Sequence, residues 1–83
     1  MFIHITGKEN VVVVNTSAIV KMEAYAYEGH PHIRIDLLKG TVVIQFSEEA
    51  QRAYFLDSMN DFLETDRPFM KVSVKEVRTN NNQ

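Results

Sequence analysis

The segment TVVIQFSEEAQRAYFLDSMNDFL, residues 41–63, contains the change of hydrophobic period on which the predicted fold depends. Its first six residues alternate, with Val42, Ile44 and Phe46 on one side, and this period of two is typical of a strand. After Ser47 the apolar residues recur at the 3.6-residue spacing of a helix. The segment therefore joins a strand to an amphipathic helix, and it predicts an α+β protein.

The predicted helix runs through SEEAQRAYFLDSMNDFLETD, residues 47–66. Ser47 is a good N-cap, and Glu48 and Glu49 place negative charge in the first turn, where the helix dipole favours it. One side of the helix is apolar and is expected to face the core. The apolar set is Ala53, Phe55, Leu56, Met59, Phe62 and Leu63. The polar set on the other side is Gln51, Arg52, Asp57, Asn60, Asp61 and Glu64.

Five strands are predicted before the helix, separated by turn signals at hairpin spacing. The VVVV run at residues 11–14 does not alternate, which predicts a strand covered on both faces. A sixth strand is predicted after the helix in FMKVSVKEV, residues 69–77. The expected fold is a five- to six-stranded, mainly antiparallel sheet in the order β-β-β-β-β-α-β, with the helix on one face.

The length and composition of the chain indicate one small domain. We expect the domain to cover residues 1–78 and a frayed polar tail to cover residues 79–83. The net charge of −2 and the pI near 5.8 give no general attraction to nucleic acid or acidic membranes. The absence of cysteine excludes disulfides, thiolate zinc sites and cysteine nucleophiles. With no apolar run long enough to span a bilayer and no signal-peptide pattern, a cytoplasmic location is expected.

The alternating segment AIVKMEAYAYE, residues 18–28, predicts a strand with two different faces. The apolar face, which is expected to point at the core, carries Val20, Met22, Ala24 and Ala26. The opposite face carries Ile19, Lys21, Glu23, Tyr25 and Tyr27. Arg34 and Asp36 of the following strand are expected beside this second face. Since one helix covers only one face of a sheet, the surface with the two tyrosines is expected to be exposed.

We call the exposed surface of Lys21, Glu23, Tyr25, Tyr27 and Arg34 the tyrosine face. Cross-strand aromatic pairs stabilise a sheet, and tyrosine is also enriched in homodimer and other protein interfaces. Aromatic residues beside lysine and arginine also stack on single-stranded nucleic acid, although the interleaved acidic residues weaken this interpretation. We predict a non-enzymatic interaction module that acts through self-association or a protein partner. Binding of single-stranded nucleic acid is the alternative.

His30 and His32 flank a proline and raise the question of a metal site. Zinc needs three or four ligands that converge from different parts of a fold. The other potential ligands are His4, Glu28 and Asp36, and their spacing in the sequence does not direct any of them toward the pair. The sequence Gly29-His30-Pro31 is therefore interpreted as a hairpin loop, and no metal or other cofactor is predicted. A pH sensor is a further alternative, because histidine titrates near neutral pH.

No catalytic site is predicted. None of the four serines lies in a Gly-x-Ser-x-Gly sequence, and the three glycines are scattered singly at turns. The carboxylates of Asp57 and Asp61 lie on the predicted solvent side of the helix, whereas catalytic pairs lie in clefts. We expect a small bacterial or phage accessory or regulatory protein that is not an enzyme.

Two resemblances accompany these predictions. The segments VVVVNTSAIVKMEAY and TVVIQFSEEAQRAYFLDSMNDFL resemble the small FlbD-like bacterial proteins associated with flagellar genes. The FlbD-like proteins share a pattern of strand, polar break, strand, hairpin and helix. In this chain the pattern is matched by Asn15, Ile19, Met22 and Glu23. The longer hairpin and the strand after the helix depart from that pattern. The layout is also similar to the coactivator or Whirly type of single-stranded DNA-binding module, which implies a dimer. Neither resemblance assigns a functional residue.

Overall fold

The computed structural model describes residues 1–65 and 67–80 of the chain. This part contains one α-helix and seven strands, with a short 3-10 helix between the second and third strands. The elements in chain order are β1 (Phe2–Thr6), β2 (Val11–Asn15), η1 (Thr16–Ala18), β3 (Ile19–Tyr27), β4 (His30–Leu37), β5 (Thr41–Gln45), α1 (Glu49–Leu63), β6 (Phe69–Ser73) and β7 (Glu76–Asn80).

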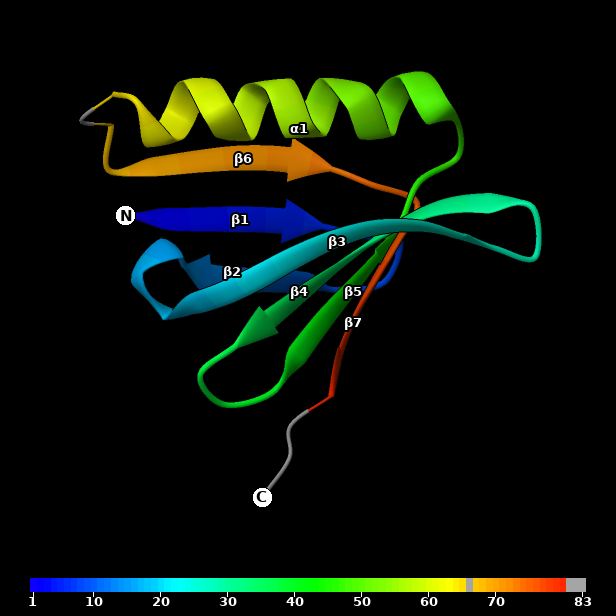
Figure 1. Cartoon of the computed structure of the whole chain (residues 1–83), viewed down its shortest axis with the longest axis horizontal. Helices are drawn as coiled ribbons and strands as arrows, with labels where there is room; N and C mark the ends of the chain where they lie inside the picture. The colour runs from blue at the N-terminus through cyan, green and yellow to red at the C-terminus, as the bar shows by residue number, and fades with distance from the viewer. Residues whose placement is uncertain (66, 81–83) are drawn as a thin grey trace.

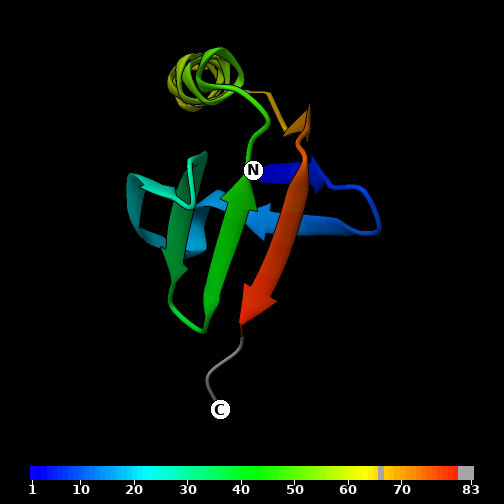
Figure 2. The ribbon, with the colours of Figure 1, turned by 90° about the vertical axis from the view of Figure 1, so that its right-hand side faces the viewer.

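The strands form two sheets, with the orders β2-β1-β6 and β3-β4-β5-β7. The four-stranded sheet is antiparallel throughout, whereas β1 pairs antiparallel with β2 and parallel with β6. Figures 1 and 2 show the two sheets crossing steeply, with α1 along one open side between them. The predicted α+β class with mainly antiparallel strands is confirmed. The predicted single sheet of five or six strands is only roughly matched, because the seven described strands form two sheets and the chain changes sheet three times.

The first change of sheet occurs at the polar break after β2. The side chain of Asn15 accepts a hydrogen bond from the Ser17 amide at 3.0 Å, and the 3-10 turn η1 follows at once. This turn redirects the chain, so that β3 pairs with β4 and not with β2. The spacing of the two segments in the sequence therefore suggested a hairpin that does not form.

The second change of sheet is the return from β5 through α1 to β6, and the third divides the predicted strand at residues 69–77 into β6 and β7. β6 pairs with β1, whereas β7 pairs with β5 in the other sheet. Between them, the Val74 amide donates to a carbonyl at the end of β1 and the Lys75 amide donates to one at the end of β5. Strand β7 includes positions 79 and 80 of the predicted polar tail, and positions 81–83 lie outside the described residues.

A β-bulge near the start of β3 changes the face of the sheet to which the side chains before it point. The register with β4 shifts between Ile19 and Lys21, so Val20 has no partner and its side chain is 64% exposed. Because the bulge inserts one residue, Ile19 faces the core together with Met22. The predicted grouping of Ile19 with Lys21, and of Val20 with Met22, is wrong for this reason.

The β3–β4 hairpin extends beyond the body of the molecule (Figure 1). Its loop is Glu28-Gly29, with φ of 51° and 78°, and two positive φ angles are typical of a type I′ turn. His30 and Pro31, predicted to be in the loop, lie in β4. Pro31 occupies the pair next to the hydrogen-bonded pair at the loop, so its missing amide costs no bond to β3, and its carbonyl accepts from the Phe46 amide on the other side at 2.9 Å. This extension also exposes two alanines expected in the core, Ala24 and Ala26.

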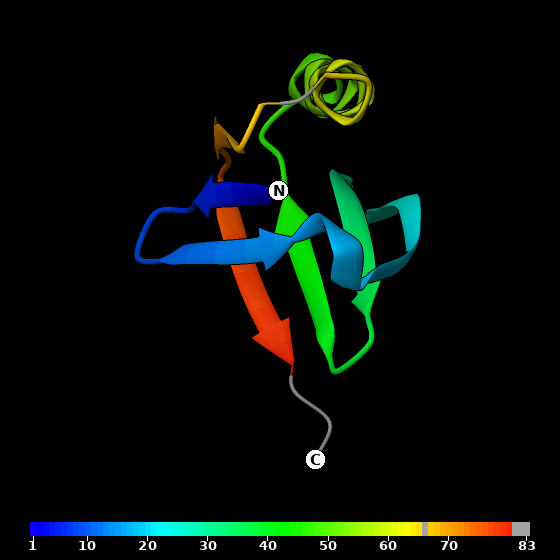
Figure 3. The same ribbon diagram turned by 90° about the vertical axis from the view of Figure 1, so that its left-hand side faces the viewer.

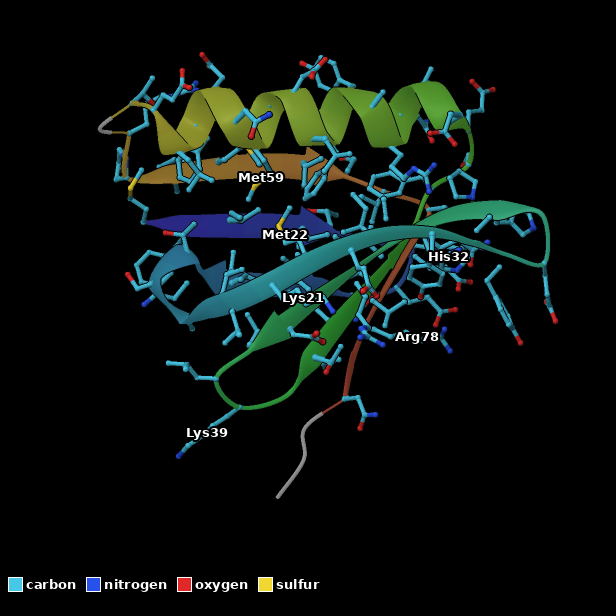
Figure 4. All side chains as sticks on the ribbon, viewed as in Figure 1. Lys21, Met22, His32, Lys39, Met59 and Arg78 are labelled. Carbon is cyan, nitrogen blue, oxygen red and sulfur yellow. The ribbon has the colours of Figure 1, made fainter. Side chains whose placement is uncertain are left out.

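The core lies between the two sheets and α1. Its buried apolar side chains are Ile3, Ile5, Val14, Ile33, Ile35, Val42, Ile44, Phe46, Phe55, Met59, Phe62 and Val77. Figure 4 shows Met59 of α1 and Met22 of β3 pointing into the same space between the two elements. Three of the buried residues come from the predicted apolar side of the helix, whereas Ala53 and Leu63 of that side are exposed.

Helix α1 begins slightly later than predicted. Its N-cap is Glu48 and its first residue is Glu49, so the assignment of Ser47 as the N-cap is wrong. The reason is the side chain of Gln51, whose carbonyl oxygen accepts hydrogen bonds from the amides of Ser47 at 2.9 Å and Glu48 at 3.3 Å. These two amides are thus satisfied outside the helix, and the regular helix starts after them.

Candidate functional site

The tyrosine face lies on the side of the four-stranded sheet that is turned away from the core. The pairing of β3 with β4 places Lys21, Glu23 and Tyr25 opposite Asp36, Arg34 and His32. In Figure 2 strands β4, β5 and β7 lie in front of β1 and β2, and no other described element covers them. The structure thus brings all five predicted residues onto one open surface.

Four charged side chains form a ladder on this face. The Nζ atom of Lys21 lies 2.9 Å from Glu23 Oε1, and the Arg34 guanidinium lies 3.6 Å from Glu23 and 3.2 Å from Asp36. A hydrogen bond and the charge of Lys21, followed by the charge of Arg34, lower the pKa of Glu23 below its usual 4.5. Two positive and two negative groups neutralise one another, so the ladder has no net charge.

Aromatic rings occupy the end of the face next to the hairpin loop. Tyr25 stacks on His32 with the ring centroids 5.2 Å apart, and Tyr27 meets the same imidazole edge-on at 6.0 Å. Nδ1 of His32 lies 2.9 Å from the His30 carbonyl oxygen and therefore carries a proton, which it donates to that oxygen. His32 is 3% exposed, whereas Tyr27 is 59% exposed. A buried imidazole thus holds two tyrosines, one of which offers most of its surface to solvent.

A pocket of about 280 Å³ lies where these rings meet the other strands. It is lined by Tyr27, Glu28, His30, His32, Gln45, Glu76 and Arg78. Figure 4 shows His32 and Arg78 on this sheet, from strands that are far apart in the sequence. Sequence reasoning missed Glu76 and Arg78 because β7 was not separated from β6. The alternation of these two residues with Val77 was the signal that pointed to this face.

Arg52 connects α1 to the tyrosine face. It was assigned to the solvent side of the helix, but its side chain is only 16% exposed. Its guanidinium donates to the carbonyl oxygens of Tyr25 at 2.7 Å and His32 at 3.3 Å. It also donates to both carboxylate oxygens of Glu49, at 2.6 and 2.7 Å. The first turn of the helix is therefore bonded directly to the β3–β4 hairpin.

A second open surface, which the sequence did not predict, lies on the outer side of the three-stranded sheet. We call it the apolar face, and it is formed by Phe2, Val11, Val13 and Phe69, which are 45–57% exposed. The run of valines in β2 was expected to be buried on both sides. Only its second and fourth members face inward, because β2 is at the edge of a sheet with a single covered side.

The histidine pair shows no metal-ligand arrangement in the described ranges. No group of three or more histidine, aspartate or glutamate side chains among residues 1–65 and 67–80 is placed to hold a metal ion. His32 uses Nδ1 for the bond to the His30 carbonyl, and both histidines belong to β4 and not to a loop. Within the same ranges, no helix combines the length and the apolar character needed to cross a membrane.

Comparison of the chain with models of protein families, with curated proteins and with solved structures finds no match. The two resemblances noted in the sequence therefore stay predictions.

Proposed function

We propose that this chain is a non-enzymatic interaction module that acts through self-association or a protein partner. The observation that supports this function best is the exposed ring of Tyr27, which is packed on the buried His32. A tyrosine already held in place loses little conformational entropy when it enters an interface, and tyrosine is enriched in interfaces. A small bacterial or phage accessory or regulatory protein in the cytoplasm is the setting we propose.

The charge of the tyrosine face favours a protein partner over nucleic acid. The cations of Lys21 and Arg34 are paired with Glu23 and Asp36, so little positive charge is left for phosphates. Alternating charges of both signs instead suit a protein surface with the complementary charge pattern. Such complementarity orients the partner and discriminates against other proteins.

The apolar face is the better surface for a second copy of the chain. Homodimer interfaces are more apolar than other protein interfaces, and this face combines four exposed apolar side chains. Besides these it carries His4, Thr6, Asn15, Lys71 and Ser73, with no carboxylate among its described residues. A small domain also gains stability from burying such a surface in a dimer.

The first test is the solution mass by light scattering over a series of protein concentrations. We expect a dimer, and we expect Val13→Glu to raise its dissociation constant by roughly tenfold or more, because the variant buries an unpaired charge. Tyr27→Glu is expected to leave the dimer intact and to abolish capture of a protein partner. Ser17→Glu, at an exposed turn, is the matched control for added charge.

If the solution mass falls for Tyr27→Glu and not for Val13→Glu, the chain associates through the tyrosine face and not through the apolar face. The proposal fails if the parent is a monomer at every concentration and Tyr27→Glu captures the same proteins as the parent.

Single-stranded nucleic acid is the second candidate, and it is supported by Arg78 beside Tyr27 in the same pocket. It predicts salt-sensitive binding of a thymidine oligonucleotide that Tyr25→Ala, Tyr27→Ala and Arg34→Ala each weaken. Equal binding by the parent and all three variants contradicts this function.

A further inference from the structure

Strand β6 has a free edge that runs alongside α1. β6 pairs with β1 on one side and with no described strand on the other. In that parallel ladder the Val74 amide donates to the Thr6 carbonyl. Because successive backbone groups of a strand point in opposite directions, the N–H and C=O groups of Phe69, Lys71 and Ser73 point toward the free side. Such a row of groups is able to pair with a further strand.

Two adjoining hollows, of about 410 and 400 Å³, lie along this edge between β6 and α1. Tyr54, Lys71 and Val72 line both hollows, so the two form one groove. On the helix side the groove is also lined by Ala50, Gln51, Ser58 and Asp61. Figures 2 and 3 show α1 end-on with β6 beside it, and no described element continues the sheet past β6.

The walls of this groove combine free backbone groups with apolar side chains. Met70 and Val72 are half-buried on the inner side of β6, and the ring of Tyr54 is 72% exposed on the facing side of α1. In an added strand every second side chain would face inward, toward these three residues. The groove therefore offers both a hydrogen-bonding edge and an apolar contact for alternate residues.

We propose that this groove binds an extended peptide segment of a protein partner, which adds to β6 as a further strand. The inward-facing residues of the peptide are apolar and contact Tyr54, Met70 and Val72. The outward-facing residue opposite Lys71 is acidic, because Lys71 is exposed and has no ion pair among the described residues. This site is separate from the tyrosine face, whereas Phe69 and Lys71 belong both to its lining and to the apolar face.

The position of α1 excludes a second copy that pairs through its own β6. Two such strands in antiparallel register are related by a two-fold axis perpendicular to the sheet, which brings both helices to the same face. Paired strands lie about 4.8 Å apart, whereas packed helices need about 8–10 Å between their axes. Since α1 already lies along the free edge, the two helices would occupy the same space. A segment that lacks its own flanking helix fits this groove.

The test begins with selection of peptides from a random display library on the full chain. A selected peptide is then synthesised, and its affinity is measured for the parent and for three variants. Lys71→Pro removes the amide donor on the free edge but leaves the ladder to β1, and edge strands tolerate proline in this orientation. Lys71→Ala keeps the amide and removes the charge. Tyr54→Ala removes an exposed ring whose loss leaves the core intact.

We expect Lys71→Pro to weaken binding by roughly tenfold or more, and Tyr54→Ala by roughly fivefold or more. Lys71→Ala should weaken binding less, and this loss should disappear at high salt. Bound peptide should protect the amides of Phe69, Lys71 and Ser73 from hydrogen exchange. If circular dichroism shows that Lys71→Pro is unfolded, Tyr54→Ala and the amide protection decide the question.

Three results would overturn the proposal. One is a library that yields no binder, and another is a peptide that binds the folded variants as tightly as the parent. The third is protection of the β6 amides that rises with protein concentration in the absence of peptide, because it would show that a second copy occupies the edge. Repeating the measurement with Val13→Glu separates this result from a dimer through the apolar face.

Discussion

Glu23 lies between two cations, and both lower the pKa of its carboxyl group. The Lys21 ammonium is the larger cause, through a hydrogen bond and its charge, and the Arg34 guanidinium adds to it. The folded chain therefore keeps Glu23 ionised at a lower pH than the unfolded chain, in which the pKa is near 4.5. The resulting stabilisation is fully present above that pH, and it is lost as the pH falls through the lowered pKa.

Replacing this carboxylate is expected to make stability less dependent on pH. Glu23→Gln should lower the Tm slightly at neutral pH, because exposed ion pairs contribute little, and should have no such effect once the parent carboxyl is protonated. Thermal melts of parent and variant over a pH series that passes below 4.5 check this. Glu28→Gln, in the hairpin loop, is the control. A Tm difference that stays constant across the series contradicts the assignment.

At the scale of elements, Arg52 joins two parts of the fold that the sequence treats as separate. The pattern of α1 assigns this residue to the solvent side, because the pattern records only the spacing of polar residues along the helix. Its length allows the guanidinium to reach the backbone of the β3–β4 hairpin. Long cationic side chains bury their stems in this way, so a polar position on a helix is not always a solvated one.

Removal of this connection is expected to destabilise the protein. Arg52→Ala leaves two backbone carbonyls without their charged donor and should lower the free energy of unfolding by about 1.5–3 kcal/mol. Arg52→Lys keeps the charge but loses the planar fork, so it should recover only part of that loss. Urea unfolding of the three proteins measures the difference. A loss below about 0.5 kcal/mol for the alanine variant would mean that the contact has no structural role.

The strands that change sheet show where local patterns stop being informative. Alternation continues from Met70 through Val72 to Val74, although the chain passes from one sheet to the other near Val74. The alternation of apolar and polar residues indicates which side of a strand is covered. It does not indicate which other strand pairs with that strand. The division into β6 and β7 therefore depends on contacts with β1 and β5, both distant in the sequence.

At the scale of the whole molecule, one small core supports both sheets and the helix. Phe55 of α1 is fully buried, and its ring lies 5.6 Å from the ring of Phe46, between β5 and the helix. Domains of this size have a total stability of about 4–12 kcal/mol. A single large side chain in this core therefore accounts for a substantial fraction of that free energy.

Truncation of this ring is expected to bring the protein close to unfolding. Phe55→Ala should lower the free energy of unfolding by about 3–5 kcal/mol, because it removes buried apolar surface and leaves a cavity. The neighbouring Tyr54→Ala, at an exposed position, should change the same free energy by less than about 0.5 kcal/mol. Denaturant unfolding monitored by circular dichroism measures both. Equal effects of the two variants would contradict the described packing.

What the sequence determined by itself is the local structure and the identity of the tyrosine face. The switch of period near Phe46 predicted the helix, the alternation from Lys21 to Tyr27 predicted an exposed mixed surface, and both are observed. These features depend on residues that are neighbours in the chain. Side-chain periodicity is therefore enough to define them.

Only the tertiary structure decided how the strands are shared between two sheets, where the apolar face lies, and that no strand of the described residues pairs with β6 on the side of α1. The bulge at Val20, the turn after Asn15 and the link at Val74 each redirect the chain by a small local change. Their consequences depend on which distant strand is available for pairing. The physical reason is that backbone hydrogen bonds between strands, unlike those within a helix, are made with residues that the local sequence does not specify.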